Sequence, residues 1–525
     1  MNKLRTWLRY QRRGELQAYG LLIALALALR LFDLADRPYH HDESQDAYFS
    51  WRLFSAGEYE YDPLLHGPLR FYLTALVYLV AGVSDFTARL PPALLGTGMV
   101  ALAWGLRPVL GRVAALIVAI ALAVGPSYLY FSRFAREDIY IAFVTLALLV
   151  AVFRFLQRPA PWQPAVIGAL LAASFAVKES TFITAFVFGT FLLAWLARDA
   201  LRRDHHLARR LALVGWEAWV WAVVAFVAVQ TLLFTTFFVH PDHWDALYEG
   251  LDYWLGQHEV GRGGEAWFFY IVVLALEEWP AVLLGAIGAV VALRDPTPLR
   301  VFALWGFVVS LAVYSWAGEK FSWLVLHPLL PLLLLAGLAV QAIWDRRADI
   351  IGKAGLLLVA LCAAYVVFAS WQVNAQHRAD PRELLVSTQS SEQVVDVRDQ
   401  VSRLSERVER RQGQPPSIRV DSAQGATYPW AWYFRTADDV QFLDYSVDTS
   451  AALGDVMILT EQSYQRLRPQ LDGYEARQLP FRVWWVRDYD RLTPATALQW
   501  IVKREPWSET GGMPEWLLVR SEITR

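Results

Sequence analysis

Three short polar clusters interrupt an otherwise apolar chain, and their side chains are of types that bind phosphate and accept protons. The first is His40-His41-Asp42-Glu43, the second is Arg133-Phe134-Ala135-Arg136-Glu137-Asp138, and the third has Lys320 at its centre. A carboxylate can act as a general base toward a hydroxyl group, and Arg or Lys can stabilise a departing phosphate. The combination favours transfer of a group from a phosphate ester to a hydroxyl acceptor.

The first two clusters also have structural interpretations. Asp42-Glu43 could begin a solvated loop, and a carboxylate in Glu137-Asp138 could cap a helix N-terminus. Capping does not explain why Arg133 and Arg136 lie on the side of the membrane where basic residues are disfavoured, so we interpret them as anion ligands. Two adjacent histidines beside carboxylates allow a metal site, but no second ligand spacing supports one.

Two further positions combine charge with an apolar setting. Lys178-Glu179 follows an apolar run, and the pair is either a local ion pair or part of a substrate site. His327 lies inside the run that follows Lys320, where a lone histidine is often a hydrogen-bonded core residue. With Lys320 and Arg136 near it, His327 favours a phosphate site.

The composition identifies the environment that must hold these clusters. Of the 525 residues, 56% are apolar and 19% are charged, and residues 1–371 contain repeated long apolar runs. Runs of roughly 16–25 residues exclude a wholly soluble enzyme and a transmembrane β-barrel. The net charge of −2 gives no general attraction to nucleic acid, and the single cysteine, Cys362, excludes an intrachain disulfide.

The basic residues between the runs predict how the chain crosses the membrane. Candidate spans lie near 18–34, 68–82, 90–106, 113–131, 139–157, 163–177, 181–197, 213–238, 267–293, 300–316, 323–344 and 354–371. Short cytoplasmic loops are rich in Lys and Arg, and the most basic loop, 198–210, is cytoplasmic only if the short run at 68–82 does not span. We expect about eleven spans and a cytoplasmic N-terminus; the alternative is twelve spans with weak charge bias.

Two regions flank this set of spans. The basic N-terminal segment could belong to a signal peptide, but Asp36-Arg37-Pro38-Tyr39 replaces the small-residue cleavage site, so we expect an uncleaved first span. Residues 372–525 read as an extracytoplasmic α/β domain. Its expected strands are 384–388, 418–421, 440–445, 456–460 and 481–486, and its expected helices are 391–411 and 462–471.

Carboxylates and cations near the outer membrane surface suit one donor class in particular. A polyprenyl-phosphate sugar keeps its tail in the membrane and its phosphate at the headgroup level. Cations stabilise the leaving phosphate, so only the acceptor hydroxyl needs a base. One carboxylate with a cationic clamp differs from the paired carboxylates of glycosidases and indicates direct, inverting transfer.

Several of these motifs resemble those of the GT-C superfamily of membrane glycosyltransferases. The resemblance rests on His41-Asp42-Glu43, His66-Gly67-Pro68-Leu69, Arg89-Leu90-Pro91, Ser132 through Asp138, Lys320 and His327-Pro328. The chain looks similar to the protein O-mannosyltransferases and the lipid A aminoarabinose transferases. With Gly318-Glu319-Lys320-Phe321 and Asp380-Pro381-Arg382-Glu383, the whole chain looks most like the subgroup of flippase-activity-associated proteins.

The resemblance implies a GT-C-like transmembrane domain at 1–371, with juxtamembrane helices in the first outer loop at 35–88, followed by the 372–525 domain. It assigns Asp42 as general base, with Glu43 as the substitute and Asp138 in support. The expected substrate-binding residues are His41, His66, Arg133, Arg136, Glu137, Lys178, Lys320 and His327. Lys320 and Arg136 are expected at the donor phosphate.

The chain departs from the superfamily in two respects. It lacks the Trp-Trp-Asp-Tyr-Gly motif of oligosaccharyltransferases, and its first loop has no Asp-x-Asp, so neither a metal nor another cofactor is expected. The expected partners are a polyprenyl-phosphate sugar and an extracytoplasmic protein, lipid or glycan, in a bacterial or archaeal cell membrane. The alternatives are a protein associated with lipid-linked sugar flipping and a structural subunit on a transferase scaffold.

Overall fold

The chain forms two compact units in the computed structural model, which describes residues 2–257, 263–448 and 450–524. Unit 1 comprises Met1–Leu34 and Leu53–Gln376, and unit 2 comprises Ala35–Arg52 and His377–Arg525. Unit 2 therefore includes a short segment from near the start of the chain. That segment carries the first polar cluster, His40 to Glu43.

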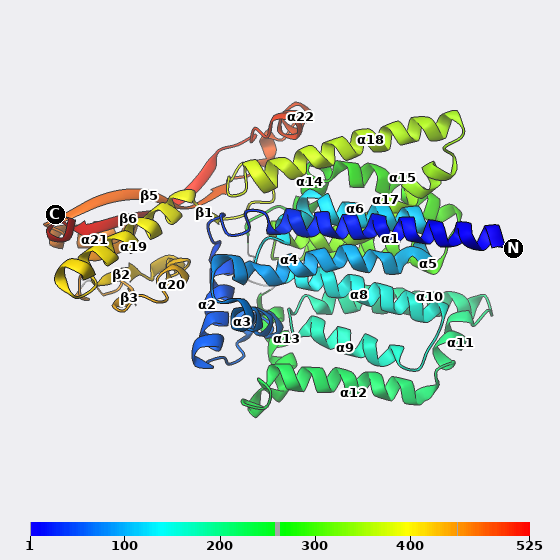
Figure 1. Cartoon of the computed structure of the whole chain (residues 1–525), viewed down its shortest axis with the longest axis horizontal. Coiled ribbons are helices and arrows are strands. Elements are labelled where there is room, and N and C mark those ends of the chain that lie inside the picture. Colours follow the sequence, from blue (N-terminus) through cyan, green and yellow to red (C-terminus); the bar gives the residue numbers. More distant parts are fainter. Residues whose placement is uncertain (1, 258–262, 449, 525) are drawn as a thin grey trace. The chain divides into compact units, whose positions relative to one another are not determined.

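Unit 1 is built from helices, most of them apolar (Figure 1). Its helices are α1 (Asn2–Leu31), α3 (Leu69–Ala81), α4 (Asp85–Leu102), α5 (Arg107–Leu110), α6 (Arg112–Val124), α7 (Pro126–Phe131), α8 (Glu137–Gln157), α9 (Gln163–Phe175), α10 (Thr181–Leu201), α11 (His206–Ala212), α12 (Gly215–Phe234), α13 (Ala246–Gln257), α14 (Phe269–Leu276), α15 (Trp279–Arg294), α16 (Pro298–Trp316), α17 (Leu326–Asp345) and α18 (Ile350–Trp371). Short 3-10 turns η1 (Pro63–Leu65) and η3 (Pro241–Asp245) precede α3 and α13. Helix α2 (His41–Ala56) passes from unit 2 into unit 1.

Eight of the described helices are long and apolar enough to cross a membrane, and the pair α14 and α15, bent by 98°, makes a ninth candidate. The chain is therefore an integral membrane protein. Helix α3 has only 13 residues, about 20 Å of helix against a hydrocarbon core of about 30 Å. Helices α6 and α9 are equally short, so the expected count of eleven spans stays a prediction.

Helix α17 forms the centre of unit 1. It packs against α6, α15 and α16. The apolar part of the span Ser322–Asp345, which contains α17, is almost entirely buried. A side chain at Gly288 of α15 would lie 1.8 Å from the Leu335 carbonyl oxygen, so glycine allows the two helix backbones to touch. The buried start of α17 carries His327, which fixes one wall of the candidate site.

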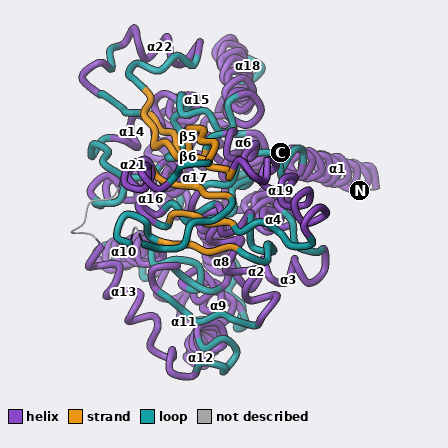
Figure 2. Tube along the Cα trace, turned by 90° about the vertical axis from the view of Figure 1, so that its left-hand side faces the viewer, coloured by secondary structure: helices purple, strands orange, loops and turns teal. Residues whose placement is uncertain are grey.

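Unit 2 contains a six-stranded mixed sheet, seen as the orange strands in Figure 2. The strands are β1 (Gln389–Ser390), β2 (Ile418–Asp421), β3 (Val440–Leu443), β4 (Val456–Thr460), β5 (Tyr474–Trp485) and β6 (Thr510–Arg520), and their order is β1-β5-β6-β4-β2-β3. Strand β2 pairs in parallel with β3 and β4, and the other pairs are antiparallel. The expected α/β domain is confirmed.

Helices cover both faces of this sheet. Helix α19 (Glu392–Gln412) buries Val394, Val397, Val401, Leu404 and Val408 against one face, the helical spacing of an amphipathic element. Helix α21 (Glu461–Leu467) covers part of the other face. The short helices α20 (Trp430–Tyr433), α22 (Pro494–Lys503) and α23 (Ser521–Thr524) complete the unit.

One expected strand of unit 2 is wrong. Residues 384–388 form turns, and the nearby strand β1 occupies Gln389–Ser390 instead. Leu384 and Val386 are buried as a strand would bury them. The Val386 amide, however, donates to the Glu383 carbonyl oxygen within a turn. A short buried apolar run does not distinguish a strand from a packed turn.

Candidate functional site

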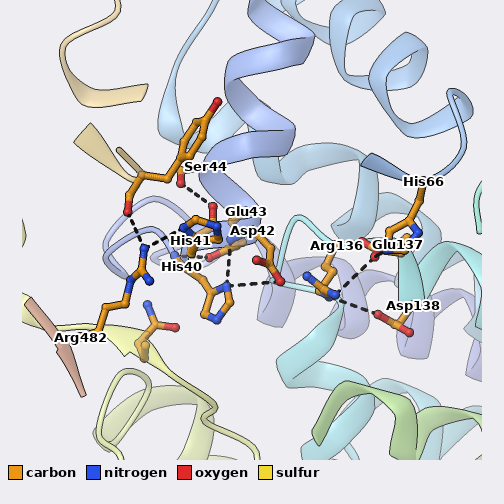
Figure 3. A network of polar contacts seen from close by, with 12 residues as sticks. His40, His41, Asp42, Glu43, Ser44, His66, Arg136, Glu137, Asp138 and Arg482 are labelled. Carbon is orange, nitrogen blue, oxygen red and sulfur yellow. Dashed lines mark hydrogen bonds and ion pairs between the residues drawn. The ribbon is translucent and has the colours of Figure 1, made fainter. Parts of the chain in front are cut away.

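The first polar cluster lies at the start of α2 in unit 2 (Figure 3). The fully buried Glu43 accepts a hydrogen bond from Arg37 Nη2 at 3.0 Å and from the His40 backbone amide at 3.2 Å. The carboxylate therefore reaches back to the residue before the helix, as an acidic third residue does in a capping box. This gives Glu43 a structural role in setting the first turn of α2.

Asp42 is the more accessible of the two adjacent carboxylates. Its side chain is 28% exposed, whereas Glu43 is fully buried. The Asp42 amide donates to His40 Nδ1 at 3.1 Å, and the Asp42 carboxylate lies 3.9 Å from the same nitrogen. The arrangement buries one carboxylate at the helix start and leaves the other partly exposed.

His41 is held by the sheet of unit 2. Arg482 on β5 lies 2.8 Å from His41 Nδ1 and also donates to the carbonyl oxygens of Gly425 and Tyr428. The Tyr428 ring packs edge-on against the imidazole, with ring centroids 5.6 Å apart. Arg482 joins α2 to two parts of the later domain, a role that no motif in the sequence marks.

A second group of charged residues, the ionic cluster, lies in unit 1 (Figure 3). It comprises His66, Arg70, Arg136, Glu137, Asp138, Lys178, Glu179 and His327. Glu137 and Asp138 occupy the first turn of α8, where backbone N–H groups favour negative charge. The sequence-predicted residues His66, Arg136, Glu137, Asp138, Lys178 and His327 thus come together.

Glu137 is the most heavily paired carboxylate of the ionic cluster. Its Oε1 lies 3.2 Å from His66 Nε2, 3.2 Å from Lys178 Nζ and 3.4 Å from Arg136 Nη2. Arg136 also lies 3.5 Å from Asp138, and its guanidinium stacks 3.9 Å above the Trp323 ring. Burial of these charges is tolerated because each has opposite charges around it.

His66 bridges two carboxylates. Its Nδ1 lies 2.7 Å from Glu179 and its Nε2 lies 3.2 Å from Glu137, contacts that need a proton on both nitrogens. Burial alone would lower the pKa of His66, but Glu179 and Glu137 raise it above the ordinary value. The protonated imidazolium therefore adds a positive charge to the ionic cluster.

Gly67 allows the His66 loop to reach this position. The Gly67 amide donates to the Val177 carbonyl oxygen at 3.1 Å, and a Cβ at Gly67 would lie 2.3 Å from the Ala176 carbonyl. Only a residue without a side chain fits so close to another backbone. The loop before α3 is thereby fastened to the segment that carries Lys178-Glu179.

The Lys178-Glu179 pair does not bind to itself. Lys178 pairs with Glu137 and Asp138, and Glu179 pairs with His66. Burial lowers the pKa of Lys178, but Asp138 and Glu137 more than offset this and raise it. Arg70 was not predicted as a site residue, although it lies 3.9 Å from Glu137. One indication of its role was present in the sequence, because a charged residue at the start of an apolar helix is unfavourable.

His327 connects the ionic cluster to an apolar pocket. Its Nε2 lies 3.5 Å from Asp138, and its ring stacks on Tyr314 with centroids 4.8 Å apart. Both rings line a small pocket of about 40 Å³. Its other lining residues are mostly apolar and come from α8, α10, α16 and α17: Ala142, Thr145, Leu149, Ile183, Thr184, Val187, Phe188, Phe302, Gly306, Ser310, Leu326, Leu330 and Pro331.

Two expected anion ligands lie apart from these ion pairs. Lys320 is 6% exposed, donates to the Ala317 carbonyl oxygen, and forms no ion pair with any residue in the described part of the chain. Burial lowers its pKa. Arg133 donates to the carbonyl oxygens of Asn374, Phe32 and Asp33, so it joins the ends of α1 and α18.

Residues 65–229 match the family model of the dolichyl-phosphate-mannose-protein mannosyltransferases. This range contains all of the ionic cluster except His327. No curated protein matches the chain. The family match therefore covers a part of the membrane region that holds most of the ionic cluster.

Three solved structures have a similar fold. ArnT from Cupriavidus metallidurans, bound to undecaprenyl phosphate, has a TM-score of 0.63 and 16% identity, over 96% of this chain and 98% of that one. AglB from Archaeoglobus fulgidus, bound to an inhibitory peptide and a dolichol-phosphate, has a TM-score of 0.53 and 15% identity, over 79% and 63%. The arabinofuranosyltransferase AftD from Mycobacteria has a TM-score of 0.50 and 13% identity, over 97% and 40%. The expected GT-C fold is confirmed.

Proposed function

We propose that this protein is a membrane glycosyltransferase that moves a sugar from a polyprenyl-phosphate donor to a hydroxyl acceptor outside the cytoplasm. One observation carries the proposal: the ionic cluster and the apolar pocket of unit 1 share His327, which pairs with Asp138 and lines the pocket. A polyprenyl phosphate combines an anionic head with a long hydrocarbon tail. Its two chemical parts match the two parts of this site.

The pocket has the apolar lining that a lipid tail requires. Along α16 it is lined from Tyr314 to Phe302, a distance of about 18 Å at 1.5 Å per helical residue. The phenylalanine, leucine and isoleucine side chains on its walls offer no hydrogen bonds to compete with a hydrocarbon. We assign the part of the donor chain nearest the phosphate to this pocket.

Lys320 and Arg136 are the proposed phosphate ligands. Lys320 is a buried cation without a carboxylate partner among the described residues, so an arriving phosphate would find it uncompensated. Arg136 is already shared between Glu137 and Asp138 and must exchange part of this pairing for the phosphate. With His66 protonated, the cations of the ionic cluster exceed its carboxylates, which favours an anionic ligand.

Asp42 is the proposed general base, and Asp138 is proposed to support the site through Arg136. The Asp42 carboxylate takes the proton of the acceptor hydroxyl while the hydroxyl oxygen attacks the anomeric carbon. The bond from that carbon to the phosphate oxygen breaks, and the polyprenyl phosphate leaves with the electron pair. Because attack and departure occur on opposite sides, the anomeric configuration inverts.

The solved structures support the donor class. The structure of ArnT contains undecaprenyl phosphate, and that of AglB contains a dolichol-phosphate. The matching family is described by its dolichyl-phosphate-mannose donor, so we propose a hexose such as mannose as the sugar. We further propose that unit 2 and the first polar cluster face the outside of a bacterial or archaeal cell.

The test is transfer by the purified full-length protein in detergent. Labelled polyprenyl-phosphate hexose is incubated with candidate protein, lipid and glycan acceptors, and the product is analysed for a new glycosidic bond of inverted configuration. Asp42→Asn is compared with Asp472→Asn, which changes an exposed carboxylate of the same unit. Transfer by the unchanged protein and by Asp472→Asn, but not by Asp42→Asn, is the expected result.

Movement of the label across a vesicle membrane without a new bond would instead identify a lipid-linked sugar flippase component. Transfer that retains the donor configuration would exclude direct displacement. Equal transfer by Asp42→Asn and the unchanged protein would exclude Asp42 as the base.

A further inference from the structure

A group of metal-binding side chains lies in unit 1 outside the ionic cluster. Glu60 follows α2, and Asp242 and His243 belong to the turn η3 before α13. Each offers one ligand atom, and within the described residues these atoms all lie within 4.8 Å of one another. Two segments that are far apart in the sequence thus present an imidazole and two carboxylates to one point.

The separation between His243 and Glu60 suits two ligands of one metal ion. His243 Nε2 lies 3.4 Å from Glu60 Oε1, whereas N–H···O bonds cluster near about 2.9–3.0 Å. Bonds of about 2.0–2.1 Å to a tetrahedral zinc ion place neighbouring ligand atoms about 3.4 Å apart. The observed separation is that of two ligands on one ion.

The second nitrogen of His243 also has a partner of the right type. Glu249 on α13 lies 3.9 Å from His243 Nδ1. A histidine that binds a metal through one nitrogen commonly donates its other N–H to a carboxylate, which fixes the tautomer. Glu249 is in position to orient His243 for metal binding through Nε2.

The charge balance of the group favours a cation. Glu60, Asp242 and Glu249 surround one imidazole, and within the described part of the chain no Lys or Arg forms an ion pair with any of them. Protonation of His243 would offset only one of these carboxylate charges. A divalent ion would offset two and also satisfy the ligand geometry.

Aromatic packing beneath the group holds its two segments together. Tyr61, next to Glu60, packs its ring on Phe234 and His243, with centroids 4.9 and 5.9 Å away. The Tyr61 hydroxyl donates to the Ala246 carbonyl oxygen at 3.4 Å. These contacts hold both segments near one another before any ion binds.

We propose that Glu60, Asp242 and His243 bind a divalent transition-metal ion of the zinc class, with Glu249 orienting His243. The imidazole disfavours the hard ions Ca²⁺ and Mg²⁺, which prefer oxygen ligands. The ion has a structural role: it joins the segment after α2 to α13. A Cβ at Gly250 of α13 would lie 3.4 Å from Glu179 Cγ, so α13 in turn packs against the ionic cluster.

The proposal is tested on the full-length protein in detergent after chelator treatment and dialysis. Zinc is titrated against a chromophoric competitor, and thermal unfolding is followed with zinc and with calcium. We expect one zinc ion per chain and an unfolding temperature raised by roughly 2–5 °C, since a ligand of the folded state stabilises it. Calcium at the same concentration should give no shift.

Variants identify the ligands. His243→Ala and Glu60→Gln should lose the bound zinc and the thermal shift, and Glu249→Gln should bind zinc about 10- to 100-fold more weakly. His206→Ala, which removes an exposed histidine of α11, is the matched control and should bind zinc normally. Glu60→Gln keeps the shape of the side chain, so it remains informative if His243→Ala does not fold.

Two results would overturn the proposal. One is no stoichiometric zinc binding by the unchanged protein, which would leave the group as an ion pair between His243 and its carboxylates. The other is equal zinc binding by the unchanged protein, Glu60→Gln and His243→Ala, which would place the ion elsewhere. Neither result depends on glycosyl transfer.

Discussion

Arg482 donates a hydrogen bond to Nδ1 of His41, 441 residues earlier in the chain, over 2.8 Å. Since an arginine side chain has no acceptor, Nδ1 of His41 must be the unprotonated nitrogen, and the ring N–H is on Nε2. Burial lowers the pKa of Arg482, although Glu515 opposes this effect. The relationship fixes the orientation and tautomer of the residue that precedes Asp42.

Arg482→Ala should therefore reduce glycosyl transfer while donor binding stays near normal. Loss of a hydrogen bond to a charged group costs roughly 1.5–3 kcal/mol, which corresponds to a fall in rate of about 10- to 100-fold. Arg477→Ala changes an exposed arginine of the same strand and should leave the rate unchanged. Equal rates in both variants would show that the contact between Arg482 and His41 does not position Asp42.

Asp42→Asn and Glu43→Gln should fail in different ways. Asp42→Asn removes the proposed base, and transfer should fall about 10²- to 10⁴-fold with normal thermal unfolding. Glu43→Gln leaves Arg37 without its buried carboxylate partner, a loss of about 3–5 kcal/mol of stability. Thermal unfolding, monitored by intrinsic fluorescence, and the rate of transfer are measured for both variants. If Asp42→Asn lost stability and Glu43→Gln lost only activity, the roles of the two residues would be exchanged.

Lys320→Ala should weaken donor binding about 10- to 100-fold, since a charge-assisted contact contributes roughly 1.5–3 kcal/mol. Its stability should change little, because Lys320 has no carboxylate partner among the described residues to leave behind. Lys353→Ala, which changes an exposed lysine at the start of α18, is the control. Binding of a fluorescent polyprenyl phosphate provides the measurement, and equal affinity in both variants would remove Lys320 from the phosphate site.

Gly67→Ala should lower the unfolding temperature and weaken donor binding. The new methyl group would lie 2.3 Å from the Ala176 carbonyl carbon, so the His66 loop must move away from Lys178-Glu179. Gly189→Ala is the matched control, because a Cβ there meets nothing within 4 Å and alanine is the better helix former. If both variants unfold at the same temperature as the parent, the close approach of the two segments is not needed.

The His66 bridge should make stability depend on pH. Its pKa is raised in the folded protein above the ordinary 6.5, so the folded state binds the proton more tightly than the unfolded state. The stabilisation is therefore complete below about pH 6.5 and is lost as pH rises through the folded pKa. The unfolding temperature of the parent protein should fall across that range more steeply than that of His66→Gln, and parallel curves would contradict the bridge.

The long apolar helices were the most predictable elements of the molecule. The length of an apolar run is a physical constraint set by the bilayer, so α8, α10, α12, α16, α17 and α18 follow the sequence closely. The predicted span 267–293 is instead divided into α14 and α15, bent by 98°. Strands β2 and β4 were also predictable, because β2 alternates apolar and charged residues and β4 is a short, mostly apolar run. Strand β6 carries Gly511, Gly512 and Pro514, which are poor strand formers, and no local signal marks it.

Six members of the ionic cluster were among the predicted site residues, but their pairings were not predictable. The types and positions of Glu137, Asp138, Lys178 and His327 suggest buried function because charge is costly in an apolar segment. Sequence neighbours suggest that Lys178 pairs with Glu179, yet the fold directs each to a different partner. Arg482 was beyond sequence reasoning, because only the completed sheet brings it to His41.

The discontinuity of unit 2 limits how this protein can be divided. Residues 35–52 belong to unit 2 although they lie between helices of unit 1. The Tyr39 amide donates to Tyr433 Oη at 3.0 Å, and Gln389 donates to the Pro38 carbonyl oxygen at 2.8 Å. A fragment that stops after Gln376 would keep Asp42 but lose every one of these anchors. The membrane helices and the sheet therefore cannot be exchanged independently, since a bundle that received another C-terminal domain would also have to rebuild the loop that carries Asp42.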